Sequence, residues 1–518
     1  MNRSLAITIL VALGTGSGLS GQSGSRATPS PAVQRAAATI TEADVRRRIF
    51  VIAHDSMGGR STPSPGLSKT ANYIAAEFRR FGLKPGGDSG TYLMNYPIAR
   101  RQLLAGRSSV RFGNAAQDLT ISTTLEQGAA LIAGPTEAVA RGEVVLLGGV
   151  VVPDSIQADD VKGRVVVYAP STQDQSINRL AQRLAALGAS ALTVVIGSDS
   201  ALAAYSRRQV APQTVVGRRG GIPVLALLER GVTTQLPEAA DQFAQLRAAP
   251  GPVVMPMPDW SGEVVLRDTV LSMTRGPNVV GILEGSDPAL RNEYLVYSAH
   301  MDHVGVAGQP GSSCRPAGAD SLCNGADDDG SGTVGVVELA EAFSRPGARP
   351  RRSVIFLTVS GEERGLWGSN WFANNPPVPV GQIVANLNAD MIGRNWKDTI
   401  VVIGKEHSDL GATLARVNAA HPELNMAAID DRWPQENFYR RSDHYNFAVK
   451  GIPILFFFSG VHEDYHRPSD TPDKIDAEKE SRILRLMFYL GREVGNAAEK
   501  PKWNPESYKQ IVERQGGN

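Results

Sequence analysis

The sequence has 518 residues, more than a single hydrophobic core normally organises, so we expect two or three domains. Hydrophobic residues make up 42% of the chain and charged residues 20%, the balance of a soluble globular protein. The formal net charge of +1 argues against binding to nucleic acids or membrane surfaces through bulk charge.

The chain begins with the pattern of a secretory signal peptide over residues 1–21. Arg3 precedes an apolar stretch from Leu5 to Leu13, and small residues follow it. This stretch is too short to span a bilayer, and no later segment is long and apolar enough. No cysteine follows it that would carry a lipid. We therefore expect a secreted or periplasmic protein without a membrane anchor, with a disordered Ser/Pro/Ala/Gly-rich leader over residues 22–40.

The rest of the chain divides into regions with two different sequence patterns. Residues 41–81 carry a helical apolar stripe that Gly82 ends. Residues 110–260 favour a separate, small, β-rich domain with a helix at 178–187 and short strands at 143–147, 163–168, 191–196 and 223–228. From residue 261 strands alternate with helices: strands at 293–298, 353–359, 383–388, 399–403 and 452–458, and helices at 333–343, 408–421 and 477–497.

Strands such as Val354–Leu357 are almost continuously apolar. Such strands predict a central sheet covered by helices on both faces. The predicted fold is therefore α/β, with a mixed, largely parallel sheet. In sheets of this kind ligands bind at the carboxyl ends of the strands.

Cys314 and Cys323 are the two cysteines of the sequence. The oxidising compartment that a signal peptide implies, and the Gly/Ser/Pro-rich segment around them, favour a disulfide that closes a loop. Zinc binding by thiolates would need a second pair of cysteines. We expect the disulfide.

Candidate metal ligands begin just after the strand at 293–298, where Ser298–His303 supplies two imidazoles and a carboxylate. A lone His300 is weak evidence, because isolated histidines are more often structural. A second cluster, Asn324–Gly332, places three adjacent carboxylates in a glycine-rich turn before a predicted helix. Mutually repelling carboxylates are costly unless a cation neutralises them, so this cluster indicates a metal, against the alternative of an exposed acidic turn that caps the helix.

Polar residues follow three further predicted strands: Glu362 and Glu363, then Asp390, then His466. Two neighbouring Glu can act differently, one binding a metal ion and the other taking a proton from its water. The convergence of His, Glu, Asp and His at four strand ends, with an Asp from the acidic turn, is more specific than any one of these residues.

Two histidines and three carboxylates without a thiolate suit zinc first, with cobalt or manganese as alternatives. If one carboxylate bridges, two ions can each take three protein ligands and share a water. Open coordination of this type indicates catalysis rather than a structural role.

Five motifs together resemble the zinc aminopeptidases of peptidase family M28. They are His300-x-Asp302, Gly325–Gly332, Gly361-Glu362-Glu363-x-Gly365-Leu366-x-Gly368-Ser369, Asp390–Gly393 and Tyr465-His466-x-Pro468-x-Asp470. The resemblance implies a zinc-exopeptidase (phosphorylase/hydrolase-like) domain over residues 41–109 and 261–512. Residues 110–260 resemble the protease-associated (PA) domain often inserted in that family, an identification that depends on pattern and position.

The resemblance also implies a role for each site residue. His300 and Asp390 would bind one zinc, Glu363 and His466 the other, and Asp328 would bridge both. Glu362 would be the general base, Asp302 would fix the tautomer of His300 by hydrogen bonding to its free nitrogen, and Tyr465 would help to stabilise the tetrahedral intermediate. A cis peptide between Asp328 and Asp329 is implied as well.

Other polar residues leave alternatives open. Ser442-Asp443-His444 resembles a family segment near the site, so Asp443 would orient the substrate amine or neighbouring groups, although helix capping by Ser442 and Asp443 explains the segment equally well. His303 and His462 are interpreted as rim residues.

The predicted function is that of a secreted di-zinc aminopeptidase acting on peptides with a free amino end. Two zinc ions lower the pKa of the bridging water, Glu362 accepts its proton, and the hydroxide attacks the peptide carbonyl. Carboxypeptidase action or one-zinc glutaminyl cyclase activity on the same fold are alternatives, as is a receptor-like binding protein. A serine protease built on Ser89 is disfavoured, because Gly87–Gly90 is interpreted as a turn.

Overall fold

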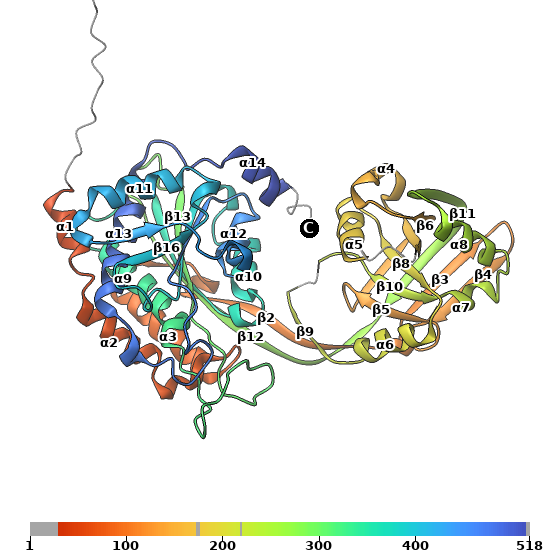
Figure 1. The fold of residues 1–518 in the computed structure, drawn as a ribbon, viewed down its shortest axis with the longest axis horizontal. Coiled ribbons are helices and arrows are strands. Elements are labelled where there is room, and N and C mark those ends of the chain that lie inside the picture. The colour runs from red at the N-terminus through yellow and green to blue at the C-terminus, as the bar shows by residue number, and fades with distance from the viewer. Residues whose placement is uncertain (1–28, 172–176, 218–219, 514–518) are drawn as a thin grey trace, which may run out of the picture.

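The computed structural model describes residues 29–171, 177–217 and 220–513, which form two β-sheets with helices packed around each (Figure 1). One sheet has ten strands and the other has eight. The predicted signal peptide, residues 1–21, lies outside the described residues. None of the described helices combines the length and the apolar character that crossing a membrane requires.

The ten-stranded sheet has the strand order β17-β16-β18-β15-β13-β14-β12-β2-β9, with β1 paired to β12. Its strands are β1 (Lys84–Pro85), β2 (Leu93–Leu103), β9 (Gln213–Val216), β12 (Asp268–Leu283), β13 (Tyr294–His300), β14 (Ser353–Val359), β15 (Ile383–Asp390), β16 (Thr399–Ile403), β17 (Ala427–Ile429) and β18 (Ile454–Phe458). The neighbours β18, β15, β13 and β14 run parallel, whereas β16 on β18 and the pairs beyond β14 are antiparallel. The sheet is therefore mixed and parallel at its centre, and four carboxyl ends meet at one edge.

Helices cover both faces of this sheet, as its buried apolar strands predicted. One face packs against α2 (Glu42–Ile52), α3 (Pro65–Arg80), α9 (Gly332–Phe343), α11 (Leu410–Ala420) and α13 (Ala477–Asn496). The other face packs against α10 (Trp367–Asn374), α12 (His444–Ala448) and the C-terminal segment that follows α14 (Pro505–Tyr508). The central strands consequently have no solvated face.

The helical pattern predicted over residues 41–81 forms two helices rather than one. Helix α2 ends at Ile52, and Gly58 and Gly59 then adopt positive φ angles of 59° and 66° in a tight turn. Helix α3 begins where Ser64 accepts a hydrogen bond from the Leu67 amide, with Pro65 in the first turn. The glycines, which permit the left-handed conformation, and this capping serine explain the break.

Of the predicted disordered leader, residues 22–40, the structure describes residues 29–40, and these are partly helical. Residues 31–37 form helix α1 (Pro31–Ala37), which Ser30 caps by accepting a hydrogen bond from the Val33 amide. Val33, Ala36 and Ile40 are buried in the core beneath the ten-stranded sheet. The prediction is therefore wrong for this part, because a few small apolar side chains find a partner surface that composition cannot reveal.

The eight-stranded sheet has the order β4-β3-β11-β6-β7-β8-β10-β5 and gathers on the right in Figure 1. Its strands are β3 (Ser109–Asn114), β4 (Leu119–Thr124), β5 (Ala129–Ala133), β6 (Ala138–Gly149), β7 (Val165–Pro170), β8 (Ala191–Ile196), β10 (Val224–Leu228) and β11 (Val253–Leu266). The helices around it are α4 (Ala158–Val161), α5 (Ile177–Ala186), α6 (Asp199–Gln209), α7 (Glu229–Thr233) and α8 (Ala239–Ala248). Strand β9, from the same part of the sequence, pairs instead with β2 of the ten-stranded sheet. The domain boundaries and the PA-like identity remain predictions.

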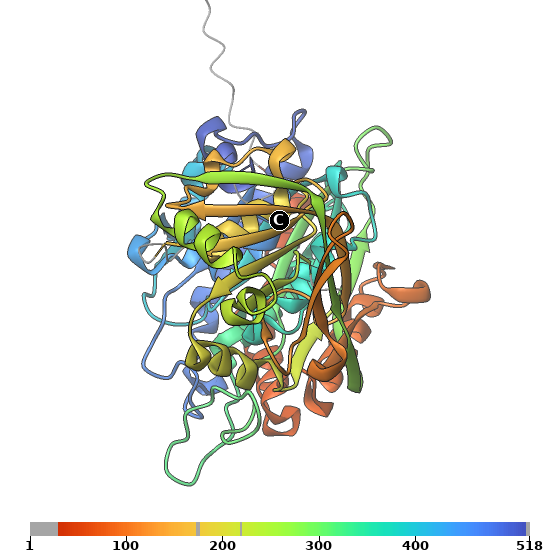
Figure 2. The same cartoon turned by 90° about the vertical axis from the view of Figure 1, so that its right-hand side faces the viewer.

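The long strands that connect the two sheets are absent from the sequence prediction. Strand β12 has 16 residues, of which residues 269–275 are exposed and residues 276–281 are buried. Figure 1 shows β2 and β12 leaving the ten-stranded sheet side by side toward the eight-stranded one, which faces the viewer in Figure 2. An exposed ribbon carries no alternation of buried and solvated positions, so the pattern that reveals a strand is missing.

Candidate metal centre

The predicted ligands meet at one edge of the ten-stranded sheet. His300 is the last residue of β13 and Asp390 the last of β15, while Glu363 follows β14 and His466 follows β18. These four strands are parallel neighbours, so their carboxyl ends lie together. Asp328 reaches the same edge from the turn before α9.

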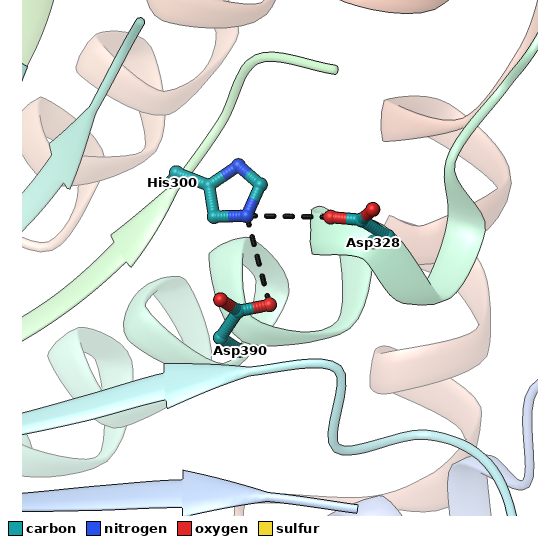
Figure 3. Close-up of side chains that lie close together, drawn as sticks. All are labelled: His300, Asp328 and Asp390. Carbon is teal, nitrogen blue, oxygen red and sulfur yellow. Dashed lines mark ion pairs between the residues drawn. The ribbon is translucent and has the colours of Figure 1, made fainter. Parts of the chain in front are cut away.

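Three of these side chains form a first group (Figure 3). The Nε2 atom of His300 lies 3.3 Å from Oδ1 of Asp328 and 3.6 Å from Oδ1 of Asp390. All three residues are buried. The close-up shows both carboxylates pointing at the same imidazole nitrogen, an arrangement able to hold a metal ion.

A second group lies on the other side of Asp328. The Nε2 atom of His466 lies 3.2 Å from Oδ2 of Asp328 and 3.2 Å from Oε2 of Glu363. Asp328 therefore presents one carboxylate oxygen to each group, as a bridging ligand must.

His303 belongs to the second group, although the sequence interpretation placed it on the rim. Its side chain is fully buried, and its Nδ1 atom lies 3.0 Å from Oε1 of Glu363 and 3.6 Å from Oδ2 of Asp328. The rim interpretation is therefore wrong. The loop after β13 turns this side chain inward. In the sequence, the one sign of a role at the centre is that His303 directly follows His300-x-Asp302.

The polar atoms of the second group fit a bound cation. Within the described residues, five buried atoms here lack a hydrogen-bond partner: Nδ1 and Nε2 of His303, Oδ2 of Asp328, Oε1 of Glu363 and Nε2 of His466. Burial lowers the pKa of His466, but Asp328 and Glu363 outweigh it and raise the pKa to about 10. The carboxylates thus favour a positive charge between them, and imidazole with carboxylate is a ligand set that suits zinc.

The three acidic residues of the turn before α9 have different partners. Asp329 accepts hydrogen bonds from the amides of His300, Gly332 and Met391, and Asp327 accepts one from the Gly393 amide. Only Asp328 faces both ligand groups. The peptide between Asp328 and Asp329 is cis, as predicted. Backbone amides therefore bind both oxygens of Asp329 and one oxygen of Asp327, whose other oxygen lies 3.2 Å from Nε2 of His462.

Two further buried side chains hold this turn in place. Asp470 accepts hydrogen bonds from the amides of Asp327 and Asp328. Arg60 is completely buried and donates to the carbonyl oxygens of Ile52, Met301, Asn324 and Gly325. Arg60 thus joins the end of α2, the loop after β13 and the acidic turn.

Asp302 contacts His300 through its main chain. The Nδ1 atom of His300 donates to the Asp302 carbonyl oxygen over 3.1 Å, whereas a carboxylate oxygen of Asp302 lies 3.8 Å away. That carboxylate accepts hydrogen bonds from the Thr62 hydroxyl and the Glu362 amide. The main-chain contact directs Nε2 of His300 toward Asp328 and Asp390. The Asp302 side chain instead positions the Glu362 main chain.

Glu362 and Tyr465 line the space beside the two groups. Burial raises the pKa of Glu362 well above its usual range, His300 acts against this shift, and Glu363 adds to it. The ring of Tyr465 stacks on that of His466, with 3.9 Å between the ring centroids. Burial, Asp328 and Glu363 raise the pKa of the Tyr465 phenol, so it stays protonated.

Ser442 and Asp443 do not cap α12 through their side chains. The Ser442 hydroxyl instead donates to Oδ2 of Asp390 over 2.8 Å, which leaves Oδ1 to face His300. Asp443 is fully buried, and burial raises its pKa to about 7. The capping alternative is therefore not supported, the orienting role predicted for Asp443 stays a prediction, and Ser442 is the residue that contacts a candidate ligand.

The loop between the two cysteines supports His466. Cys314 and Cys323 form the predicted disulfide. Within the loop, the hydroxyl of Ser313 lies 3.1 Å from Nδ1 of His466, and the Arg315 amide donates to the His466 carbonyl oxygen. The hydroxyl contact occupies Nδ1 and leaves Nε2 to face the carboxylates.

A small cavity of about 50 Å³ opens beside the first group. Five apolar residues line it, namely Met391, Phe438, Phe456, Phe458 and Val461, together with His300, Asp328, Glu362, Asp390 and Tyr465. Ser442 and Arg441 complete the lining. Ser89, by contrast, is exposed in a turn between α3 and β2.

The segment that contains the candidate ligands is similar in sequence to known proteins. Residues 278–491 match peptidase family M28. The leupeptin-inactivating enzyme 1 of Streptomyces exfoliatus is 35% identical over 205 residues, which cover 38% of this chain and 39% of that protein. A probable leucine aminopeptidase of Arthroderma otae is 28% identical over 229 residues, or 43% of this chain and 58% of that protein. The chain thus spans about two fifths to three fifths of the length of these curated relatives.

Two solved structures are similar over different shares of the chain. An aminopeptidase from Aneurinibacillus sp. strain AM-1 covers 90% of this chain and 97% of its own, with a TM-score of 0.46 and 17% sequence identity. A Porphyromonas gingivalis glutaminyl cyclase covers 43% and 80%, with a TM-score of 0.33 and 19% identity.

Proposed function

We propose, because residues 278–491 match peptidase family M28, that the chain is a metallo-exopeptidase that removes single residues from the amino end of peptides. The observation that carries the proposal is the meeting of His300, Glu363, Asp390 and His466 around Asp328 at the carboxyl edge of four parallel strands. Ligands that converge from separate strand ends form a site for chemistry rather than a structural staple.

Two zinc ions would occupy the centre. His300 and Asp390 would hold one ion, Glu363 and His466 the other, and Asp328 would bridge them through its two oxygens. The separate contacts of Oδ1 and Oδ2 of Asp328 support this assignment. When bound, zinc lowers the pKa of a coordinated water and polarises a carbonyl oxygen.

Glu362 would be the general base. It lines the cavity next to His300 and Asp328, and burial keeps the pKa of its carboxyl raised, which suits a group that takes up and releases a proton. Glu362 accepts a proton from the attacking water and delivers it to the departing amine. The bond from its amide to Asp302 holds it in place for both transfers.

Asp302 and Tyr465 would assist this chemistry. The Asp302 carbonyl oxygen fixes the tautomer of His300 in which Nε2 is free to bind metal. Tyr465, protonated and facing the cavity, would donate a hydrogen bond to the oxygen of the tetrahedral intermediate.

The cavity indicates the side chain of the residue that is removed. Met391, Phe438, Phe456 and Phe458 give it apolar walls, and its volume of about 50 Å³ is small. We infer that peptides beginning with a modest apolar residue are the preferred substrates, because such a side chain is removed from water without leaving a polar group unpaired.

Arg441 favours one alternative, carboxypeptidase action. Its guanidinium lies over the Phe438 ring at the cavity, where a cation would attract the carboxylate end of a peptide. Substitution Arg441→Ala separates the two. An aminopeptidase should tolerate it, whereas a carboxypeptidase should lose affinity for its substrate.

The disulfide between Cys314 and Cys323 supports an extracellular or periplasmic location, since such bonds persist in oxidising compartments. Together with the signal-peptide pattern of residues 1–21, it leads us to propose that the enzyme is exported.

Hydrolysis of aminoacyl chromogenic substrates, free peptides and amino-blocked peptides tests the proposal, each with chelator and after zinc is restored. We expect cleavage only when the amino end is free, loss of cleavage with chelator, and recovery with zinc. Cleavage of amino-blocked peptides would favour the carboxypeptidase, and activity that survives thorough chelation would remove metal from the mechanism.

A further inference from the structure

We propose that His303 is a further ligand of the second metal ion, which it binds through Nδ1. The inference rests on the proposed function in one respect, that this centre binds two ions. It adds a sixth residue to the five predicted from motifs, and it concerns a side chain that the sequence interpretation had left at the rim.

The position of His303 carries the inference. The side chain is completely shielded from solvent, and neither ring nitrogen has a hydrogen-bond partner among the described residues. An imidazole that is buried and unpaired is costly, because its nitrogens lose water without any replacement. Since Nδ1 lies 3.0 Å from one carboxylate and 3.6 Å from a second, a cation shared with those carboxylates provides the missing partner.

A direct hydrogen bond from His303 to Glu363 is the simplest rival explanation. Their atoms Nδ1 and Oε1 are close enough for one, yet neither atom is hydrogen bonded. The separation is therefore short while the direction is wrong for a proton between them. This geometry is expected when Nδ1 and Oε1 both point at a metal ion between them rather than at each other.

His466 shows the same combination. Its Nε2 atom lies 3.2 Å from Oδ2 of Asp328 and from Oε2 of Glu363, and it too lacks a hydrogen bond. The two rings meet edge to face, with 5.6 Å between their centroids. His303 therefore satisfies the same geometric test as the histidine that the motifs assign to this ion.

The surroundings hold the His303 ring in place. Gly325 has a φ angle of 59°, and a Cβ atom at that residue would come within 2.5 Å of the ring. The main chain of the acidic turn thus packs directly against the imidazole, and the amide of His303 donates to the Arg60 carbonyl oxygen. A ring fixed in this way loses little further freedom when it binds a metal.

His303 makes the two metal sites unequal. The first ion has His300, Asp390 and Asp328, whereas the second has His303, His466, Glu363 and Asp328. The second site is then the tighter one, and the first keeps more positions for water and substrate.

Zinc counting on the purified full-length chain tests the inference. Across a series of fixed free zinc concentrations, we expect the wild type to fill the tighter site first, and His303→Ala to lose this tighter step while it still binds zinc at higher concentrations. The matched control is His444→Asn, which also removes a buried imidazole but one that stacks on Phe456 and contacts no candidate ligand. It should retain both ions.

The size of the effect separates a ligand from a supporting residue. Removing a group that only orients a ligand typically weakens metal binding by about 10- to 100-fold. We expect His303→Ala to weaken binding of the tighter ion by more than about 100-fold in chelator competition. An unchanged zinc count with unchanged competition would overturn the inference, and a loss within the smaller range would reassign His303 as a supporting residue.

A second variant keeps the test decisive if His303→Ala fails to fold. His303→Cys offers a thiolate at the same position, which is itself a zinc and cobalt ligand. With cobalt bound, we expect a thiolate-to-cobalt charge-transfer band that the wild type lacks, and its absence in a cobalt-loaded variant would overturn the inference. Failure of the wild type to cleave peptides while it binds two ions would refute the proposed function and leave this result standing.

Discussion

The two sheets differ in what they bury. Around the ten-stranded sheet, charged side chains such as Arg48, Arg60, Asp329 and Glu480 are shielded from solvent. Of the residues that the structure describes between 109 and 266, which supply the eight-stranded sheet, no charged one is buried. One core therefore tolerates charges, while the other buries apolar and uncharged polar side chains.

This difference has an energetic meaning. A buried charge is costly unless it is paired, and an ion pair often stabilises a fold no better than apolar side chains of the same size. Charges that remain buried around one sheet only, several of them at its carboxyl edge, indicate that this region is arranged for chemistry. Substitutions in the charged region should accordingly affect activity, metal binding or stability, whereas those in the other region should affect only stability.

The largest expected effect is that of Glu362→Gln at the centre. Loss of the proton acceptor should lower kcat by about 10²- to 10⁴-fold, while zinc content stays the same because Glu362 is not assigned as a ligand. Steady-state kinetics and metal analysis on one preparation check this. The matched change Glu238→Gln, at an exposed residue next to α8, should alter neither quantity. Full activity in Glu362→Gln would exclude Glu362 as the base.

Arg60→Met should cause the next largest effect, on stability. The substitution removes the buried guanidinium that joins four carbonyl oxygens beside the acidic turn. We expect the free energy of unfolding to fall by about 3–5 kcal/mol, as when one partner of a buried charged network is removed. Denaturant unfolding measures the change. The control is Arg111→Met, at an exposed position of β3, whose free energy of unfolding should stay within about 0.5 kcal/mol of the wild-type value. If both variants lose the same stability, the buried Arg60 has no special role in holding the acidic turn.

Leu225→Ala probes the apolar core of the other sheet. Leu225 is fully buried in β10, and its truncation should cost about 2–5 kcal/mol by leaving a cavity. Zinc content and kcat should stay at wild-type values under conditions where the protein is folded. Loss of zinc from the folded Leu225→Ala variant would show that the two regions are coupled.

Strands and helices with strong patterns were predictable from sequence. Strands β8, β14 and β16 begin and end where their apolar runs do, because each is buried on both faces. The exposed half of β12 and the buried helix α1 were not predicted. In both, the partner surface that fixes the conformation lies far away in the sequence.

The candidate site shows the same limit. Asp328 and four further candidate ligands meet because strand ends in a parallel sheet share an edge. The sequence could not tell which carboxylates of the acidic turn are satisfied by amides, nor that His303 points inward. Both depend on loop conformation, which no periodicity encodes. The sequence does not single out Arg60 either, because its partners are main-chain carbonyl oxygens, which every residue carries.

The smallest expected effect concerns the loop that the disulfide closes. Ser313→Ala removes the hydroxyl that contacts Nδ1 of His466, so the ring should be oriented less firmly. We expect the dissociation constant of the ion held by His466 to rise by about 10-fold, the lower end of the range for groups that orient a ligand. Chelator competition measures it, and Ser313→Thr, which keeps the hydroxyl, should restore most of the affinity. If both variants bind zinc equally weakly, the loop acts through packing and not through this contact. If both bind like the wild type, His466 is fixed by its own backbone, whose φ angle of 57° already constrains the side chain, and the charged region is then more rigid than its loops suggest.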